Sequence, residues 1–439
     1  MELAGPGFAS LPPELLATIC TFLCSHCERE HNGQPWPFEA DPDHQNYGSA
    51  QAGVQTPAQR LGSRSDSANL SSLSRVCRSL HAAAEPFLYH CPATSGQSDL
   101  WLLAKTLINR PDLASRVLEL DLGYPTLDAS ILLTAMLLHL APSLQRAHFC
   151  LPSDSAFNTL LAELAWSCPP LLSLKALAFS VLDTIFRPTK LSGAAPILRL
   201  APHLRALHLD SCSSVTKHLG VFLGRDANTQ PPSLHITELS LSHASLDFES
   251  LRFLLRETGP RLSRVSIRRT GTLRARGDWG HRLEFNDVLN NLNGSQQTLK
   301  NLSFTSSKEV LFTPARPRLD ISTLHNFQAL EILRTDAVFF TSHGETKPDN
   351  NPFTATIPSS LQELHLGGYY VNLGPDLRVL LAAFQVGHYA ALRKIEIDAG
   401  VAEEYDPESE AAQQLREVAA SFRSAGVDFV VHGDEHQHP

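Results

Sequence analysis

A short pattern of apolar positions recurs along most of the chain. In each copy, two apolar residues lie three positions apart and a third follows two positions later, as in LRALHL at residues 204–209. The alternation at the end of each copy predicts a strand with every second side chain in a core. Ten copies, including a degenerate one at Leu330, begin at Val117, Leu144, Leu174, Leu204, Ile236, Leu262, Leu299, Leu330, Leu361 and Leu392.

The spacing of the copies predicts a leucine-rich-repeat architecture. The copies lie about 31 residues apart on average, slightly more than the about 20 to 29 residues of most such repeats. Segments between copies carry helical periodicity, as in residues 246–255. One strand-helix unit leaves an apolar face open, and stacking of units closes it. We therefore expect an α/β solenoid over residues 99–432, with a parallel sheet on its concave side and helices on its convex side. A helix at 408–423 and a strand at 427–431 would cap it, and 433–439 would be a flexible tail.

Two amphipathic helices are expected ahead of the repeats. Residues 11–23 start with prolines and place apolar side chains at positions 15, 16, 19 and 23, the spacing of one helix face. Residues 70–81 repeat this pattern, and Asn69 is a good helix cap. The segment between them, residues 28–68, is rich in polar residues, Gly and Pro and almost free of aliphatic side chains. This composition predicts a disordered insertion.

These two segments resemble the two halves of an F-box, and residues 82–90 and 107–117 resemble the F-box tail and repeat entry of filamentous-fungal F-box proteins with leucine-rich repeats. The resemblance implies an F-box domain over 8–92, interrupted by the insertion 28–68. It also implies the substrate-recognition subunit of an SCF-type cullin-RING E3 ubiquitin ligase. In that family the F-box binds a Skp-type adaptor, which links it to cullin and RING subunits, and the repeats bind a target protein.

The resemblance also assigns an adaptor-binding face, position by position. Its members are apolar or thiol-bearing residues of the two helices: Leu11, Pro12, Leu15, Ile19, Leu23, Leu70, Leu73, Val76, Cys77 and Leu80. Some of them must instead form the small core of the domain itself. The alternative is that both helices only pack against the first repeats, which would leave a ligase-independent leucine-rich-repeat scaffold for protein interactions.

Target recognition is expected on the concave sheet, where residues between the core positions point outward. The candidates are charged or histidine side chains: His208, Asp210, Glu238, Arg264, Arg268, Glu363, His365, Lys394 and Glu396. In the first two copies the corresponding residues are Glu119, Asp121, Arg146 and His148. Residues 261–282 hold seven arginines, which could grip a phosphorylated or acidic degron. An ordinary solvated surface is the alternative interpretation.

Composition and charge narrow the function further. The chain has 439 residues, 43% of them hydrophobic and 18% charged, as is typical of globular proteins. Its formal charge of -9 argues against a general nucleic-acid or membrane-surface binder. No apolar run is long enough to span a bilayer, so we expect a protein of the cytoplasm, the nucleus or both. The eight cysteines are unevenly spaced and favour reduced thiols over a disulfide framework.

The sequence holds no catalytic motif for a hydrolase, a nucleotide-binding protein or a metalloprotease. We therefore expect no catalytic residue, no cofactor and a non-catalytic adaptor role, with a hydrolase as the remaining alternative. Cys24 and Cys27 have the spacing of half a zinc site, and His31 or His44 could add a ligand. Because no second pair of cysteines follows, the sequence favours buried or loop thiols and no metal.

Overall fold

The computed structural model describes residues 11–32, 64–94, 97–122, 128–151, 170–181, 189–190, 200–210, 212–213, 235–242, 252, 255, 261–269, 285–306, 321–337, 357–367, 373–398 and 409–432. These residues belong to two compact units, an N-terminal unit that ends at His235 and a C-terminal unit that starts at Ile236. The sequence predicted one solenoid over 99–432 and did not indicate this division.

The N-terminal unit contains parallel strands in chain order. Their order in the sheet is β1-β2-β3-β4-β6. Their bounds are β1 Ala93–Thr94, β2 Glu119–Leu122, β3 Arg146–Leu151, β4 Ala176–Val181 and β6 Ala206–Asp210. Two short strands, β5 (Thr189–Lys190) and β7 (Cys212–Ser213), form a separate parallel pair.

The C-terminal unit continues the same arrangement. Its strands are again parallel and pair in chain order. Their bounds are β8 Glu238–Ser242, β9 Arg264–Arg269, β10 Asn301–Ser306, β11 Ile332–Asp336, β12 Glu363–Gly367, β13 Lys394–Asp398 and β14 Asp428–His432.

All ten predicted strands are present, and each begins two residues after the first apolar residue of its copy. The three apolar positions of a copy are buried, as Leu299, Leu302 and Phe304 show. Equivalent positions also pair across neighbouring strands, with Leu302 opposite Leu333. Because every strand contributes its core side chains at the same level, the cores of successive repeats are continuous, and the predicted leucine-rich-repeat fold is confirmed.

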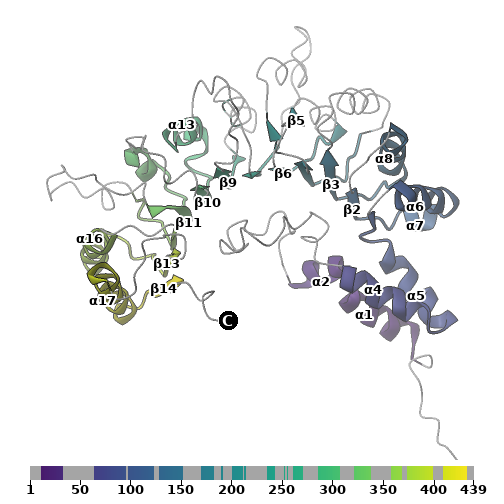
Figure 1. The fold of residues 1–439 in the computed structure, drawn as a ribbon, viewed down its shortest axis with the longest axis horizontal. Helices are drawn as coiled ribbons and strands as arrows, with labels where there is room; N and C mark the ends of the chain where they lie inside the picture. The colour runs from purple at the N-terminus through teal and green to yellow at the C-terminus, as the bar shows by residue number, and fades with distance from the viewer. Residues whose placement is uncertain are drawn as a thin grey trace, which may run out of the picture. The chain divides into compact units, whose positions relative to one another are not determined.

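Helices connect several of these strands. Those in the repeats are α8 Asp128–Leu140, α13 Phe285–Asn291, α16 Leu373–Gln385 and α17 Glu410–Ser424, with 3-10 turns η5 Asn293–Ser295 and η6 Ile321–Asn326. Between β10 and β11 the described residues include one 3-10 turn, η6. In the C-terminal unit, α16 and α17 pack against each other on the convex side of the strands (Figure 1). The expected terminal helix and strand are thus confirmed as α17 and β14. Of residues 246–255, Arg252 and Leu255 are described and helical.

The N-terminal unit begins with a cluster of helices. They are α1 Pro13–Leu23, α2 Ser25–Asn32, α4 Arg64–Ser74, α5 Arg78–Leu88, α6 Gln97–Asn109 and α7 Pro111–Ala114. Helices α1, α4 and α5 pack against one another (Figure 1). Their core consists of Cys20, Cys24, Leu70 and Ala84.

Three sequence predictions for this region were wrong. The single helix expected at 70–81 is two helices that meet at residues 75–77, so Asn69 lies inside α4 and caps nothing. Residues 28–32 and 64–68, expected to be disordered, are helical parts of α2 and α4. The rest of that insertion, like the predicted tail 433–439, lies outside the described residues. Helix α2 escaped prediction because its sequence, SHCEREHN, has no apolar stripe.

Candidate functional site

Helix α1 carries apolar side chains on two neighbouring faces. Leu16 and Cys20 face the helical core and are buried. Leu15, Ile19 and Phe22 lie four and three positions apart and therefore share another face. Leu15 is 51% exposed and Phe22 is 61% exposed. We call these three residues the α1 stripe; the other described residues leave this apolar surface largely exposed, although Ile19 is half-buried and His31 of α2 packs on Phe22.

The predicted adaptor-binding residues separate into two groups. Leu70 and Leu80 are buried, and Leu23 and Leu73 pack on the helical core, so these four stabilise the domain itself. The others reach the surface. Pro12, Leu15 and Val76 are exposed, Val76 by 69% in the turn between α4 and α5, while Leu11, Ile19 and Cys77 are half-buried. Phe22 was missing from the predicted face, although its spacing from Leu15 and Ile19 could have revealed it.

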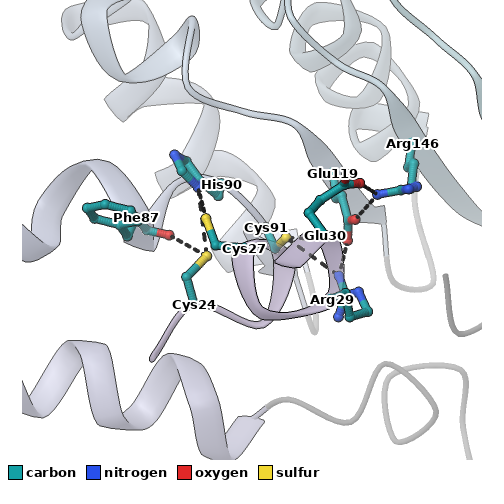
Figure 2. A network of polar contacts seen from close by, with 9 residues as sticks. All are labelled: Cys24, Cys27, Arg29, Glu30, Phe87, His90, Cys91, Glu119 and Arg146. Carbon is teal, nitrogen blue, oxygen red and sulfur yellow. Dashed lines mark hydrogen bonds and ion pairs between the residues drawn. The ribbon is translucent and has the colours of Figure 1, made fainter. Parts of the chain in front are cut away.

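The polar residues of the first repeats are not open to solvent. Glu119 on β2 is buried beneath α2, where it pairs with Arg29 of α2 and with Arg146 of β3, 2.9 Å away. Arg146 also pairs with Glu30 of α2 at 2.8 Å (Figure 2). Asp121 and His148 are buried as well, with 2.6 Å between a carboxylate oxygen and Nδ1. The expectation that these residues are open to solvent was wrong; for Glu119 and Arg146 the reason is α2, whose residues 28–32 were expected to be disordered.

The equivalent surface of the C-terminal unit is only partly exposed, and Ser266 of β9 and Ser303 and Thr305 of β10 are buried there. In β8, β12 and β13, buried core residues alternate with half-buried outward ones. There the carboxylate oxygens of Glu396 lie 2.9 Å from His365 Nδ1, 2.8 Å from Lys394 Nζ and 2.5 Å from His432 Nε2. His365 also lies 3.2 Å from Glu363. Four of the predicted target-binding residues therefore form one network, which we call the β12–β13 network.

Electrostatics within the β12–β13 network favour the ionised form of Glu396. The contact with His365, followed by those with Lys394 and His432, holds the pKa of Glu396 far below its ordinary value, although burial opposes this. Burial lowers the pKa of the neighbouring Arg334, and Glu363 and Glu396 counteract that effect. The network therefore contains positively and negatively charged side chains, whose hydrogen-bond donors and acceptors are held in place by one another.

The remaining predicted target-binding residues have different environments. His208 is buried on β6, which corrects the expectation that it is open to solvent. Asp210 ends β6, and its side chain lies outside the described part. Arg264 pairs with Glu238 at 3.5 Å, and both are partly exposed, as is Arg268. The arginines beyond residue 269 lie outside the described residues, so the arginine-rich patch stays a prediction.

A cluster of sulfur and nitrogen atoms lies where α1 ends and α2 begins. Cys24 follows α1 directly, and Cys27 is in the first turn of α2. His90, just after α5, directs its Nδ1 to both thiols, 3.3 Å from Cys27 Sγ and 3.7 Å from Cys24 Sγ (Figure 2). All three ligand atoms lie within 4.8 Å of one another, close enough to hold a metal ion. We call these residues the Cys–His cluster.

The two thiols of the Cys–His cluster share protons unequally. The Cys27 thiol donates a hydrogen bond that lowers the pKa of Cys24 to about 4, with His90 adding to the effect and burial opposing it. The same interaction, together with burial, raises the pKa of Cys27. Cys20, one helical turn before Cys24, has a pKa raised by burial. The pair therefore loses its first proton easily and keeps the second.

The sequence pointed to the wrong third ligand for this cluster. His31, the nearest candidate in sequence, packs edge-on against Phe22, with ring centroids 6.0 Å apart. His44 lies outside the described residues. His90 was missed because it is 63 residues away from Cys27 and only the packing of α5 against α1 brings it near. The adjacent His90-Cys91 pair was the available signal, since metal ligands often occur close together in sequence.

Comparison with known proteins identifies no family for the chain. No family model matches it, and no curated protein matches it. Among solved structures, it is similar to the leucine-rich repeat-containing protein LegL7 from Legionella pneumophila, with a TM-score of 0.34 and 11% identity over 72% of this chain and 83% of that chain. Within the residues that the structure describes, no helix is long and apolar enough to cross a membrane. The repeat fold itself follows from the strands and their register.

Proposed function

We propose that this protein is the substrate-recognition subunit of an SCF-type ubiquitin ligase. The N-terminal helices would bind a Skp-type adaptor, and the partly exposed sheet surface of the repeats would bind a target protein. The observation that carries the proposal is the α1 stripe, in which leucine, isoleucine and phenylalanine side chains share a face and two of the three are more than half exposed. Exposed apolar surface of this kind marks interaction sites in soluble proteins. The role requires no catalytic residue, because the ligase partners perform the transfer.

The target surface in this proposal is the β12–β13 network together with Arg264 and Arg268. Its charges alternate in sign along neighbouring strands, which suits a peptide that offers both donors and acceptors. A phosphorylated degron would add pairing to the two arginines. Phosphatase treatment of the target should then abolish binding, whereas unchanged binding by an Arg264→Glu, Arg268→Glu variant would contradict this part of the proposal.

The adaptor interaction is tested by co-purification of the full chain with a Skp-type protein. A Leu15→Asp, Phe22→Asp variant places two charges on the α1 stripe without touching the core, so it should fold but lose the complex. The single change Leu15→Ala should weaken binding by about 2 kcal/mol, or about 30-fold in Kd.

The matched control is Val386→Asp, which charges an exposed apolar residue of the C-terminal unit. This variant should bind the adaptor as the wild type does. Adaptor binding that survives in the α1 variant would refute the stripe as the docking surface. A folded wild type that binds no Skp-type protein would leave the second candidate, a ligase-independent scaffold, which the partly exposed, charged sheet surface of the C-terminal unit supports.

A further inference from the structure

We propose that Cys24, Cys27 and His90 bind one zinc ion, with the two Sγ atoms and Nδ1 of the histidine as ligands. This inference is independent of any ubiquitin-ligase role. It begins with the atoms: three side chains with metal-binding groups converge from two separate parts of the chain (Figure 2). The mixture of thiolates and imidazole is the donor set that zinc prefers in structural sites.

The distances between the ligand atoms agree with tetrahedral zinc. Bond lengths of about 2.3 Å to sulfur and about 2.05 Å to nitrogen place sulfur and nitrogen ligands about 3.6 Å apart. The observed separations from His90 Nδ1 are 3.3 Å to Cys27 and 3.7 Å to Cys24. An ion could therefore enter with side-chain adjustments of a few tenths of an ångström.

His26 provides an independent observation that points to a ligand. It lies between the two cysteines in sequence, and only 7% of its surface is exposed. Neither of its ring nitrogens has a hydrogen-bond partner among the described residues, which is costly for a buried imidazole. Its ring meets that of His90 edge-on, with centroids 5.7 Å apart. His26 is therefore a candidate for the fourth ligand position, although its nitrogens lie outside the group of atoms that are all within 4.8 Å of one another.

The nearby Cys91 has other partners. Its Sγ lies 3.3 Å from a carboxylate oxygen of Glu119 and 4.0 Å from Arg29. Zinc would bind both cysteines as thiolates, with any remaining thiol protons of Cys24 and Cys27 released to solvent, and the two thiolates would balance the charge of the ion. A neutral complex suits this partly buried location.

The position of the site indicates its role. His90 accepts backbone hydrogen bonds through its carbonyl from Leu118 at 3.0 Å and Glu119 at 2.9 Å, directly at the start of β2. A zinc ion would therefore link the turn between α1 and α2 to the end of α5 and the entry of the first repeat. It would also hold together the two ends of the long segment between Cys27 and His90, which otherwise stay close through packing alone.

The test measures metal in the full chain, purified under reducing conditions and without a histidine tag. We expect about one zinc per chain, and Co²⁺ added to the chelator-treated protein should give a thiolate-to-cobalt charge-transfer band and tetrahedral ligand-field bands. The cobalt spectrum reports sulfur ligation in the wild type, so the test does not depend on a variant that folds.

Variants then assign the ligands. Cys27→Ser and His90→Ala should each lower the zinc content to below about 0.2 per chain. Cys77→Ser removes one thiol outside the cluster and should keep the full content. Wild type without zinc and without the cobalt charge-transfer band would overturn the proposal. Equal metal content in Cys27→Ser and Cys77→Ser, or a Cys24–Cys27 disulfide that forms equally fast with and without added zinc, would do so as well.

Discussion

The same cross-strand pair occurs in both units of this protein, in two different environments. In the N-terminal unit, Glu119 at the start of β2 is paired in register with Arg146 of β3, and in the C-terminal unit Glu238 of β8 is paired with Arg264 of β9. The Glu119 side chain is 6% exposed and that of Glu238 is 31% exposed. Helix α2 makes the difference, since it adds Arg29 above Glu119.

This difference separates the outward charged residues of the strands into those that stabilise the fold and those that could bind another protein. A charged side chain beneath a helix already has an ion-pair partner. It could contact another protein only if the fold were disrupted. A charged side chain on an exposed strand changes the free energy of folding little, and it can still contact another protein. The residues between core positions therefore differ in exposure, and Glu238 and Arg264 of the C-terminal unit are more exposed than Glu119 and Arg146 of the N-terminal unit.

The largest expected effect comes from removal of the buried partner. Glu119→Gln removes the carboxylate that Arg29 and Arg146 share, while Arg146 keeps its pair with Glu30, and should lower the free energy of unfolding by about 3 kcal/mol. Glu238→Gln, the matched change in the open pair, should lower it by less than about 1 kcal/mol. Urea denaturation of both full-length variants measures these values, and equal losses would show that coverage by α2 has no energetic consequence.

A second, smaller effect concerns pH and the β12–β13 network. The pKa of Glu396 is lower in the folded chain than its ordinary value of 4.5, chiefly through contact with His365. The folded state therefore binds fewer protons than the unfolded state at acid pH. The stability contributed by Glu396 is complete above the ordinary pKa and is lost as pH falls from there toward the folded pKa.

The experiment compares the unfolding free energies of wild type and Glu396→Gln from neutral pH down into the acid range. The acid slope of the variant should be smaller by up to about one bound proton. Glu417→Gln, in an exposed pair between α17 and Arg378 of α16, serves as control and should keep the wild-type slope. If both variants lose slope equally, the network has no special role in acid sensitivity.

The smallest expected effect comes from an ion pair that has the same N–O distance as a buried pair but is exposed to solvent. Lys300 Nζ lies 2.9 Å from Glu331, the same separation as between Arg146 and Glu119, but the lysine side chain is more than half exposed. Lys300→Ala should change the free energy of unfolding by less than about 0.5 kcal/mol. A loss near that of Glu119→Gln would mean that contact distance, and not burial, sets the value of these pairs.

Local patterns were sufficient for the repeats. Each strand could be placed from three apolar positions, because burial of alternate side chains requires only that the next repeat stack on them. The terminal helix and strand were predicted for the same reason. Helix α2 could not be, since its polar side chains pair with β2, β3 and the residues after α5, all distant in sequence.

The sequence by itself determined the repeat register, the core positions and the amphipathic start of the chain, because hydrophobic periodicity is a property of neighbouring residues. Only the tertiary structure decided which outward residues are covered, that the uncovered face of α1 consists of Leu15, Ile19 and Phe22, and that His90 meets Cys24 and Cys27. Those outcomes depend on long-range packing, in which a polar helix can be held by buried ion pairs that leave no periodic signal.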